Sequence, residues 1–571
     1  MKASWSVASA LVLAGSTVAS SNCRCLPGDA CWPSLQQWDA LNSTVGGRLI
    51  ATVPLGSPCH DPTYDATACA QLQEDWGLPE THYGSSSSVM QPFWANQSCD
   101  AFTPRETPCQ LGNYVSYAVD VASSDDVIAA VNFATEHNIR FVIKNTGHDY
   151  FGRSTGAGAL SVWTHHLKDI EYLDWSDQTY SGPAYKLGSG VQGFDVLEAT
   201  HERGHVIVGG ECPTVGLAGG YIQGGGHSAL STSFGLGADQ TLSFEVVTAA
   251  GKLVTASRTK NRDLYWGLSG GGAGNYGVVV SVTVKAYPSA MVSGASVTIP
   301  TGSMDADTYT ELVDRFHQLL PAMIDAGTTV IYQMLPGYFL LQPVTAYNKT
   351  ADEVKAILEP FLSVLAELGI QYTPSYTQFD SYYDFYSHYM GPLPNGHLGV
   401  GEFNYGGRLL SRTNLETNSG GIATALQKIT SEGVVAVGVG LNVSSANDVP
   451  NAIFAPWRDA AVTMQIGSAW NNTAPWSEML AEQQRMTEVF NPLLEEATPG
   501  SATYQNEANY QQPNWKKTFF GSNYCRLAKV KAKWDPENFF YVLKGVSSDA
   551  WVVDESGRMC KAEVGKCRNN A

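Results

Sequence analysis

A histidine lies inside a glycine-rich loop in the first third of the chain. Residues 144–158 read KNTGHDYFGRSTGAG, and the apolar run at 141–144 before them is typical of a short buried strand. A glycine-rich loop after a strand lets backbone N–H groups approach an anion closely, and Arg153 and Ser154 would add a positive charge and a hydroxyl donor for phosphate oxygens. His148 either caps this turn or reacts with the molecule that the loop holds.

A cysteine lies inside a second glycine-rich stretch. The stretch starts at Gly209 and reads GGECPTVGLAGGYIQGGGHSALSTSFG, and Cys212 is the only cysteine between Cys109 and Cys525. Its thiol is a buried unreactive group, one end of a long-range disulfide, or a thiolate with a chemical role.

A third glycine run, GGGAGNYGVV at 270–279, opens a strand. The first of the three loops is not the G-x-G-x-x-G dinucleotide fingerprint, and the chain has no GKS or GKT phosphate loop. Three glycine-rich loops within about 130 residues, each near a strand, suggest one extended ligand across a sheet edge. The pattern therefore predicts a large phosphorylated cofactor.

The elements that must position these loops mix helices and strands. Strands are expected at 114–119, 141–144, 243–248 and 278–284, and Ser123 with Asp125 and Asp126 provides a helix N-cap and an acidic first turn. After Pro288 the pattern predicts helices at 305–326, 351–368 and 477–496 and strands at 329–335, 338–347 and 434–441. Because helices and strands do not alternate regularly there, the predicted fold class is α+β rather than a doubly wound sheet.

Composition excludes several classes of protein. The 571-residue chain has a formal net charge of −19 and a sequence pI near 5.0, so nucleic acid is a poor partner. Only 15% of the residues are charged while 44% are hydrophobic, which excludes a disordered protein. The length predicts several domains or two large ones.

The N-terminus reads as a secretory signal. Lys2 precedes an apolar run at 7–15 and small residues at 17–20, and the run is too short to span a bilayer. We therefore expect a signal peptide at 1–20, a secreted protein and no membrane anchor. N-x-S/T sequons that fit an exported glycoprotein start at Asn42, Asn96, Asn348, Asn442 and Asn471.

Residues 21–112 form a cysteine-rich N-terminal segment. Seven cysteines lie there, and in an exported chain that density predicts disulfides rather than a metal cluster. No CxxC pair followed by a second such pair is present, so we expect no metal.

The loop motifs and two later segments resemble a known family. They are similar to those of FAD-linked oxidoreductases with a vanillyl-alcohol-oxidase-type (PCMH-type) flavin domain, in particular the berberine-bridge-enzyme-like group and its secreted fungal isoamyl-alcohol-oxidase-like members. The resemblance covers residues 113–289 and reaches the C-terminus through YQNEANY at 504–510 and NYCRLAKVKAKWDPENFF. It implies a two-part FAD-binding domain, built from 113–289 and a C-terminal segment 501–571. It also implies an α+β substrate domain with an antiparallel sheet at 290–500.

The resemblance also implies how the cofactor is held. In this family the histidine of the GHD loop bonds to the flavin 8α-methyl group, and the cysteine of the CPTVG stretch bonds to flavin C6. These positions are His148 and Cys212, so a bicovalently bound FAD is implied. Asn506 would contact the cofactor or position a neighbouring tyrosine. The remaining implied cofactor contacts are Asn145, Thr146, Gly147, Asp149, Arg153 and Ser154 at the pyrophosphate, and Gly277 and Val278 farther along the cofactor.

The implied chemistry is hydride transfer to the flavin from a carbon that bears an alcohol or amine, while a base removes the accompanying proton. Tyr504 lies where family members carry a tyrosine near the flavin, and it either acts as this base or only packs against the ring. Glu402 is a weaker candidate for the base. Val215 occupies the position that goes with oxygen access in related enzymes, which favours an oxidase.

Three functions are compatible with these residues. The first is a secreted FAD oxidase that acts on a small alcohol, a saccharide or a secondary metabolite and releases H₂O₂. The second is an FAD-dependent dehydrogenase or oxidative cyclase, and the third is a non-catalytic secreted glycoprotein, which has no need of two attachment residues. We expect a monomer whose partners are a small-molecule substrate and O₂, with neither nucleic acid nor a membrane.

An aromatic run after residue 380 has two readings. It lines a substrate cleft or, as such runs more often do, packs in a core. Its members are Tyr382, Tyr383, Phe385, Tyr386 and Tyr389.

The chain has an odd number of cysteines, 11 in all. If Cys212 is reserved for the flavin, ten remain, seven of them in the N-terminal segment and three near the C-terminus. At least one disulfide should then join the two ends if all ten pair. In the alternative, Cys525 is a free buried thiol and a second cysteine is unpaired as well.

Overall fold

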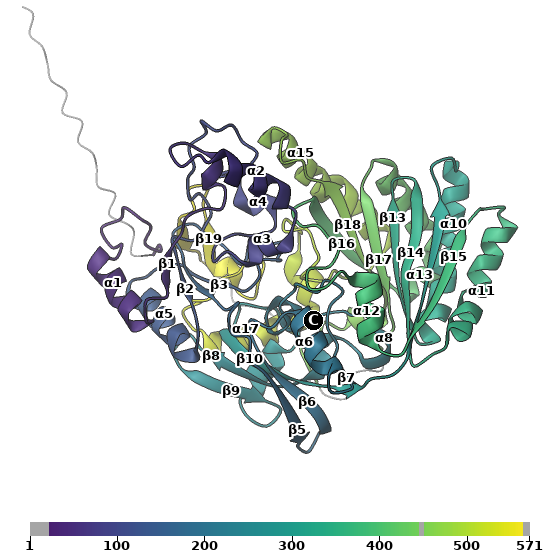
Figure 1. The fold of residues 1–571 in the computed structure, drawn as a ribbon, viewed down its shortest axis with the longest axis horizontal. Coiled ribbons are helices and arrows are strands. Elements are labelled where there is room, and N and C mark those ends of the chain that lie inside the picture. Colours follow the sequence, from purple (N-terminus) through teal and green to yellow (C-terminus); the bar gives the residue numbers. More distant parts are fainter. Residues whose placement is uncertain (1–21, 445–449, 564–571) are drawn as a thin grey trace, which may run out of the picture.

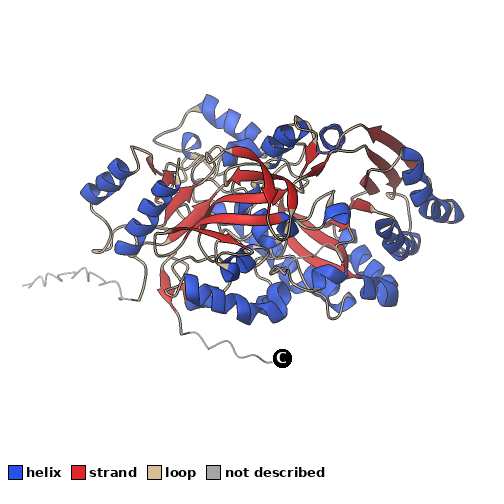
Figure 2. Cartoon of the chain, turned by 90° about the horizontal axis from the view of Figure 1, so that it is seen from below, coloured by secondary structure: helices blue, strands red, loops and turns tan. Residues whose placement is uncertain are grey.

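The chain folds into two sheet-bearing halves beneath a group of N-terminal helices (Figure 1). The structure is a computed structural model and describes residues 22–444 and 450–563. The first half holds a four-stranded and a five-stranded sheet, and the second half a seven-stranded sheet. Figure 2 shows helices surrounding the central strands. The predicted α+β class is confirmed.

The four-stranded sheet carries the first glycine-rich loop at the end of one strand. Its order is β1-β2-β4-β3, with β2, β4 and β3 parallel. Ser123 is the N-cap of helix α5 (Ser124–Glu136), and the Asp126 carboxylate accepts the Ser123 N–H at 3.1 Å. This is the predicted strand–helix–strand unit. The strands are β1 (Leu49–Ala51), β2 (Tyr117–Asp120), β3 (Phe141–Lys144) and β4 (Leu160–Trp163).

The five-stranded sheet is antiparallel, with the order β5-β6-β10-β8-β9. The third glycine run leads directly into its central strand, as the sequence predicts. The strands are β5 (Ile170–Ser176), β6 (Ser181–Gly188), β8 (Thr241–Val247), β9 (Leu253–Ser257) and β10 (Val278–Lys285).

The second half is an antiparallel sheet of order β15-β12-β14-β13-β17-β18-β16 that is covered by long helices (Figure 1). Phe316 anchors its core, since its ring lies 5.2 Å from those of both Phe339 and Phe361. The strands are β12 (Val292–Pro300), β13 (Thr328–Leu335), β14 (Tyr338–Tyr347), β15 (Thr373–Phe379), β16 (Phe403–Ser411), β17 (Val435–Gly440) and β18 (Ala460–Ala469). The helices are α10 (Ala306–Asp325), α11 (Ala351–Glu367) and α13 (Arg412–Ser431).

The helix predicted at 477–496 is interrupted. It consists of α15 (Trp476–Arg485), a π-helical turn η4 (Met486–Phe490) and α16 (Asn491–Ala497). Pro492 lies at the start of α16, and a proline lacks the N–H that a continuous α-helix needs and crowds the preceding turn. The chain therefore widens to π geometry just before the proline.

Disulfides join the N-terminal segment to itself and to the C-terminal segment. Cys23 is bonded to Cys560 across 537 residues of sequence, which confirms the predicted bridge between the two ends. Cys525 is also disulfide-bonded, so the alternative of a free thiol there is wrong. Among the described residues, Cys212 is the free cysteine. The three local bridges are Cys25–Cys31, Cys59–Cys69 and Cys99–Cys109.

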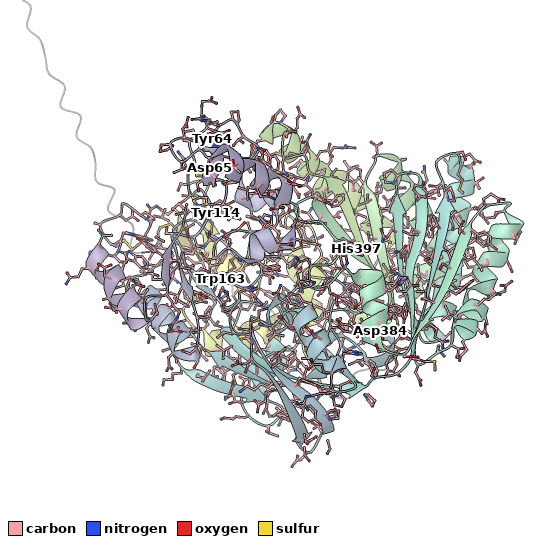
Figure 3. All side chains as sticks on the ribbon, viewed as in Figure 1. Tyr64, Asp65, Tyr114, Trp163, Asp384 and His397 are labelled. Atoms are coloured by element: carbon pink, nitrogen blue, oxygen red, sulfur yellow. A yellow bond between two sulfur atoms is a disulfide. The ribbon has the colours of Figure 1, made fainter. Side chains whose placement is uncertain are left out.

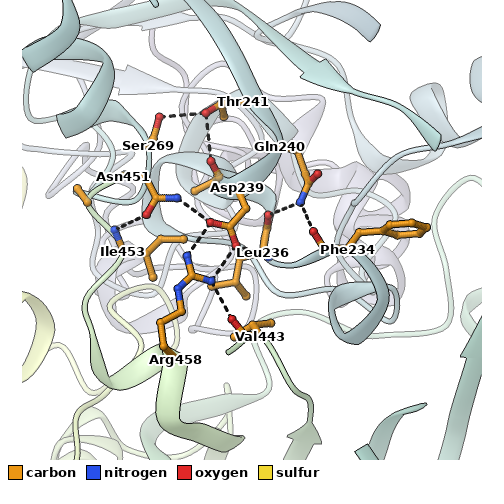
Figure 4. Close-up of polar contacts among 12 residues, drawn as sticks. Phe234, Leu236, Asp239, Gln240, Thr241, Ser269, Val443, Asn451, Ile453 and Arg458 are labelled. Carbon is orange, nitrogen blue, oxygen red and sulfur yellow. Dashed lines mark hydrogen bonds and ion pairs between the residues drawn. The ribbon is translucent and has the colours of Figure 1, made fainter. Parts of the chain in front are cut away.

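A buried ion pair joins the two halves (Figure 4). Asp239, in the 3-10 turn η3 (Gly237–Gln240), binds both terminal nitrogens of Arg458 in α14 (Pro456–Asp459), at 2.7 and 2.9 Å. Its carboxylate also accepts a hydrogen bond from Asn451 at 2.6 Å, and its side chain is only 2% exposed. This carboxylate therefore helps to join the turn after the second glycine-rich segment to the seven-stranded half.

The remaining elements are short. No helix in 22–444 or 450–563 is long and apolar enough to cross a membrane, and the same residues hold no cluster of potential metal ligands. The helices are α1 (Leu35–Thr44), α2 (Ala66–Asp75), α3 (Pro79–Tyr83), α4 (Pro92–Ala95), α6 (Gly193–His201), α7 (Ile222–Gly224), α8 (Ser231–Phe234), α9 (Arg262–Leu268), α12 (Tyr382–Met390) and α17 (Tyr524–Trp534). The strands are β7 (His205–Val206), β11 (Tyr287–Pro288), β19 (Trp551–Val553) and β20 (Met559–Lys561).

Candidate active site

Folding brings His148 and Cys212 to the same hydroxyl group. His148 Nε2 lies 2.8 Å from Thr214 Oγ1, and Cys212 Sγ lies 3.4 Å from the same oxygen. Thr214 itself is fully buried, and its carbonyl accepts a hydrogen bond from Gln192 at 2.7 Å. Two side chains 64 positions apart in sequence (212 − 148) therefore converge on one rigidly held residue.

The glycines of these loops allow the close approach. Gly147 has a φ of +90°, and a Cβ there would lie 3.0 Å from the carbonyl oxygen of Ser88. A Cβ at Gly216 would lie 2.0 Å from the Asn145 amide nitrogen, so the first two glycine-rich loops touch only because this side chain is absent.

The C-terminal segment connects the second and third glycine runs. Gln505 Nε2 donates to the carbonyls of Gly270, at 3.1 Å, and Gly224, at 3.4 Å. Asn506 Nδ2 donates to the Gly220 carbonyl at 2.7 Å. The three runs therefore surround one region, as the hypothesis of a single extended ligand requires.

Within the first loop, Asp149 organises the backbone. Its carboxylate accepts the N–H groups of Arg153, at 2.5 Å, and Ser154, at 3.2 Å, and also the Ser154 hydroxyl. The Ser154 hydroxyl is therefore hydrogen-bonded within the loop, although the sequence suggested that it donates a hydrogen bond to phosphate oxygens. Asn145 Nδ2 donates to the Ser189 carbonyl at 2.7 Å, and Trp163, labelled near the centre of Figure 3, donates its indole N–H to the Asn145 carbonyl at 3.1 Å.

Other predicted cofactor contacts lie in the surrounding structure. Thr146 is buried within the first loop. Val215 lies three residues after Cys212, and its carbonyl accepts the Gly193 N–H at 3.0 Å. Gly277 and Val278 lie at the start of β10, where a Cβ on the glycine would lie 2.7 Å from the Val247 carbonyl.

The site has the features that a large bound cofactor would satisfy. Among the residues that the structure describes, several buried polar atoms have no hydrogen-bond partner. The second glycine run also faces open space there, because a Cβ at Gly219 or Gly220 would meet none of these residues within 4 Å. Buried polar atoms are normally paired, so unpaired ones beside open glycine backbone indicate a ligand. The atoms are Asn145 Oδ1, Arg153 Nη2, Gln223 Oε1 and Gln505 Oε1. The residues present therefore fit FAD.

Burial sets the protonation of His148 and Cys212. It lowers the pKa of His148 to about 3, with smaller contributions from His82 and Lys144, so the imidazole is neutral. It raises the pKa of the Cys212 thiol, while the hydrogen bond from Thr214 acts in the opposite direction. Burial also lowers the pKa of Lys144, beneath the first loop, to about 7.

Tyr504 lies against the second glycine run, and its phenol oxygen acts as a hydrogen-bond acceptor. That oxygen receives the Gly226 N–H at 3.2 Å and the Asn506 amide at 2.8 Å. Burial raises the pKa of Tyr504 far above its ordinary value, and the Glu507 carboxylate adds to the shift. The phenol is therefore protonated at neutral pH, and its role as a base stays a prediction. Glu402 is exposed beside Gly399, just before β16.

Sequence reasoning missed a charged cluster beside Tyr504. His227 lies between two carboxylates, 2.7 Å from Glu507 and 3.2 Å from Glu211. Its ring is 5.7 Å from that of Tyr504. The available signals were a histidine directly after GGG and acidic residues next to Cys212 and within YQNEANY, but no spacing rule relates three such distant positions.

The aromatic run forms helix α12 and packs mainly in a core, as favoured from the sequence. Tyr382, Phe385, Tyr386 and Tyr389 are buried there, and Tyr383 is partly buried. Tyr386 also extends to the second glycine-rich stretch, where its hydroxyl donates to the carbonyls of Gly210 and Glu211, both at 2.9 Å.

Comparisons with known proteins agree with this geometry. Residues 115–257 match the family described as FAD binding domain, and residues 503–547 match the one described as berberine and berberine like. The FAD-linked oxidoreductase ZEB1 of Gibberella zeae is 51% identical over 95% of this chain and 96% of its own length.

Two solved structures share the fold. The VAO-type flavoprotein MtVAO615 of Myceliophthora thermophila superimposes with a TM-score of 0.92 at 40% identity, over 95% of this chain and all of the other. Glucooligosaccharide oxidase of Acremonium strictum, described with a 6-S-cysteinyl, 8α-N1-histidyl FAD, aligns with a TM-score of 0.64 at 20% identity, over 76% of this chain and 92% of its own. The chain belongs to the FAD-linked oxidoreductases of the vanillyl-alcohol-oxidase type, in their berberine-bridge-enzyme-like branch.

Proposed function

We propose that this oxidoreductase is a secreted oxidase that holds FAD through both His148 and Cys212 and oxidises an alcohol with O₂ as the electron acceptor. The observation that carries this proposal is the convergence of both side chains on Thr214, at 2.8 and 3.4 Å. A fold relative, glucooligosaccharide oxidase, is described with the same pair of flavin bonds, to a cysteine and a histidine.

When bound, FAD would accept the substrate hydride and pass the two electrons on to O₂, which gives H₂O₂. Asn145 and Arg153 would bind the cofactor through their unpaired buried atoms, and the open backbone of Gly219 and Gly220 would lie against it. Tyr504 would contact the substrate oxygen, and its phenol oxygen accepts a hydrogen bond from the Asn506 amide. Val215, beside Cys212, supports the use of O₂ because it is the smaller of the residues found at that position.

Export is the other part of the proposal. The proposed signal peptide at 1–20 lies outside the described residues. The disulfides between Cys23 and Cys560 and within the N-terminal segment suit an oxidising compartment. Of the sequon asparagines, Asn96, Asn348 and Asn471 are exposed, as an attached glycan requires. We propose a monomer that needs no partner besides its small-molecule substrate and O₂.

Three measurements test the proposed function. Flavin absorbance should remain with the acid-precipitated wild type and with each single variant, His148→Ala or Cys212→Ala, because one bond is left, and it should disappear in the double variant. Oxygen uptake with stoichiometric H₂O₂ should then be screened over primary alcohols, oligosaccharides and phenolic alcohols. Retention of flavin by the denatured double variant would refute the attachment sites, and substrate oxidation without H₂O₂ would indicate a dehydrogenase. Val215→Leu should slow reoxidation of the reduced flavin by O₂ without slowing its reduction.

A further inference from the structure

Three titratable side chains from distant parts of the sequence form one hydrogen-bonded cluster. Glu507 Oε1 lies 2.7 Å from His227 Nε2, and Glu211 Oε2 lies 3.2 Å from His227 Nδ1. The exposed fractions of the side chains are 10% for His227, 14% for Glu211 and 26% for Glu507. The cluster is therefore largely buried, and Glu507 is its most accessible member.

Both ring nitrogens of His227 are committed to carboxylates. The two negative charges raise the pKa of His227 well above its ordinary value although burial acts in the opposite direction. The ring is thus an imidazolium that donates both N–H groups, and it has no lone pair with which to accept a proton. The cluster carries one positive and two negative charges, so its net charge is −1.

The cluster lies where the proposed reaction takes place. Glu211 directly precedes Cys212, and the Tyr386 hydroxyl holds its carbonyl at 2.9 Å. Glu507 lies in one tight turn with Tyr504, since its N–H donates to the Tyr504 carbonyl at 3.1 Å. The cluster therefore extends from the attachment cysteine to the proposed substrate-contacting tyrosine.

Tyr504 is arranged to donate a hydrogen bond. Its phenol oxygen already accepts two hydrogen bonds, from Gly226 and Asn506, which leaves its own hydrogen to point elsewhere. A phenol held in this way can orient a substrate oxygen but is poorly placed to remove a proton. A nearby carboxylate is the better acceptor.

We propose that Glu507 is the catalytic base of the alcohol oxidation, with His227 and Glu211 as positioning residues; this inference rests on the proposed function. The substrate O–H bond breaks and its proton passes to the Glu507 carboxylate. The C–H bond on the same carbon also breaks, and the hydrogen leaves with both bonding electrons as a hydride to FAD. The carbon and oxygen then share the double bond of a carbonyl group. Tyr504 donates a hydrogen bond to the substrate oxygen throughout. The alcohol is oxidised and FAD is reduced. O₂, the electron acceptor in the proposed function, then reoxidises the FAD.

The first test measures flavin reduction in the absence of oxygen. The probe is whichever of benzyl alcohol, coniferyl alcohol, cellobiose and 1-octanol reduces the wild-type flavin fastest. Glu507→Gln should lower the limiting rate constant for reduction about 10²- to 10⁴-fold, the usual contribution of a general base, with little change in the apparent dissociation constant. Glu507→Asp should recover part of the rate, and exposed Glu488→Gln should match the wild type.

The second test needs no substrate. Glu507→Gln changes the net charge of the cluster from −1 to 0 and should make the flavin midpoint potential more positive. His227→Gln leaves two unneutralised carboxylates and should make it more negative, because negative charge opposes the addition of electrons. A merely structural role would not move the potential in opposite directions. Dye equilibration measures both values, and thermal melting with covalent flavin content shows that the variants are folded.

The outcomes separate the inference from the proposed function. A wild-type reduction rate in folded Glu507→Gln, or a large loss in Glu402→Gln instead, would overturn the assignment of the base. Midpoint potentials that are unchanged, or that move in the same direction in both variants, would overturn the placement of the cluster at the flavin. If the wild-type flavin is covalently bound but no probe alcohol reduces it, the proposed function fails, while the potentials still decide where the cluster lies.

Discussion

Thr214 should control attachment of the flavin, because its one hydroxyl contacts the side chains of both proposed attachment residues, His148 and Cys212. A hydroxyl can accept a hydrogen from His148 Nε2 and donate its own to Cys212 Sγ. The first bond places the imidazole proton on Nε2 and leaves Nδ1 free to form a bond. The second stabilises the thiolate, whose formation burial opposes. Thr214→Val removes the hydroxyl and preserves the shape of the side chain.

The structure sets the size of the expected effect. Loss of the hydroxyl leaves a buried imidazole nitrogen unpaired, at a cost of about 1–3 kcal/mol. That cost favours the other tautomer, so the reactive form should become about 5- to 150-fold less populated, since about 1.4 kcal/mol corresponds to a factor of ten. The Cys212 pKa should rise further, which also slows the bond to C6 at neutral pH.

The assay follows attachment directly. Protein produced in riboflavin-limited cells is mixed with FAD in air and quenched in acid at intervals, and the flavin retained by the precipitate is measured. Peptide mass spectrometry reports the His148 and Cys212 bonds separately. Thr214→Ser keeps the hydroxyl and should attach at close to the wild-type rate. The exposed variant Thr417→Val controls for loss of a threonine hydroxyl elsewhere. Formation of both bonds by Thr214→Val at the wild-type rate would refute the reasoning.

Three further outcomes concern stability. Asp239→Asn should destabilise the fold by about 3–5 kcal/mol in urea unfolding, because it leaves the Arg458 guanidinium without its buried carboxylate; additive losses in a double-mutant cycle with Arg458→Met would contradict this. The variant Cys23→Ser with Cys560→Ser should lose about 2–5 kcal/mol by releasing the 537-residue loop, and an unchanged melting temperature would count against it. Burial lowers the pKa of His317 to about 4, below its unfolded value of about 6.5, so its contribution to stability is complete above pH about 6.5 and is lost as the pH falls towards 4. Melting temperatures of the wild type and of His317→Gln should therefore converge across that interval, and parallel curves would exclude the linkage.

Local elements were largely predictable because their signals are local. The N-cap at Ser123 and the alternation of buried residues define α5 and β14 without reference to the rest of the chain. Two local details were nevertheless missed: Pro492 divides the last helix of the second half, and the Ser154 hydroxyl binds Asp149 within the loop. The cysteine parity argument succeeded because disulfide pairing depends on counts as well as geometry.

By itself the sequence determined the family, the α+β class, the two candidate attachment residues and the bridge between the chain ends. The α+β class and the bridge follow from residue patterns and cysteine numbers, whereas the family and the two candidate attachment residues are implied by the resemblance of short motifs to a known family. Only the tertiary structure decided that one Thr214 hydroxyl contacts both His148 and Cys212 and that His227 lies between Glu211 and Glu507. The three members of this cluster are separated in sequence by as many as 296 positions (507 − 211). The protonation of His227 depends on burial and on charges that meet only in the folded chain, and no local pattern encodes that encounter.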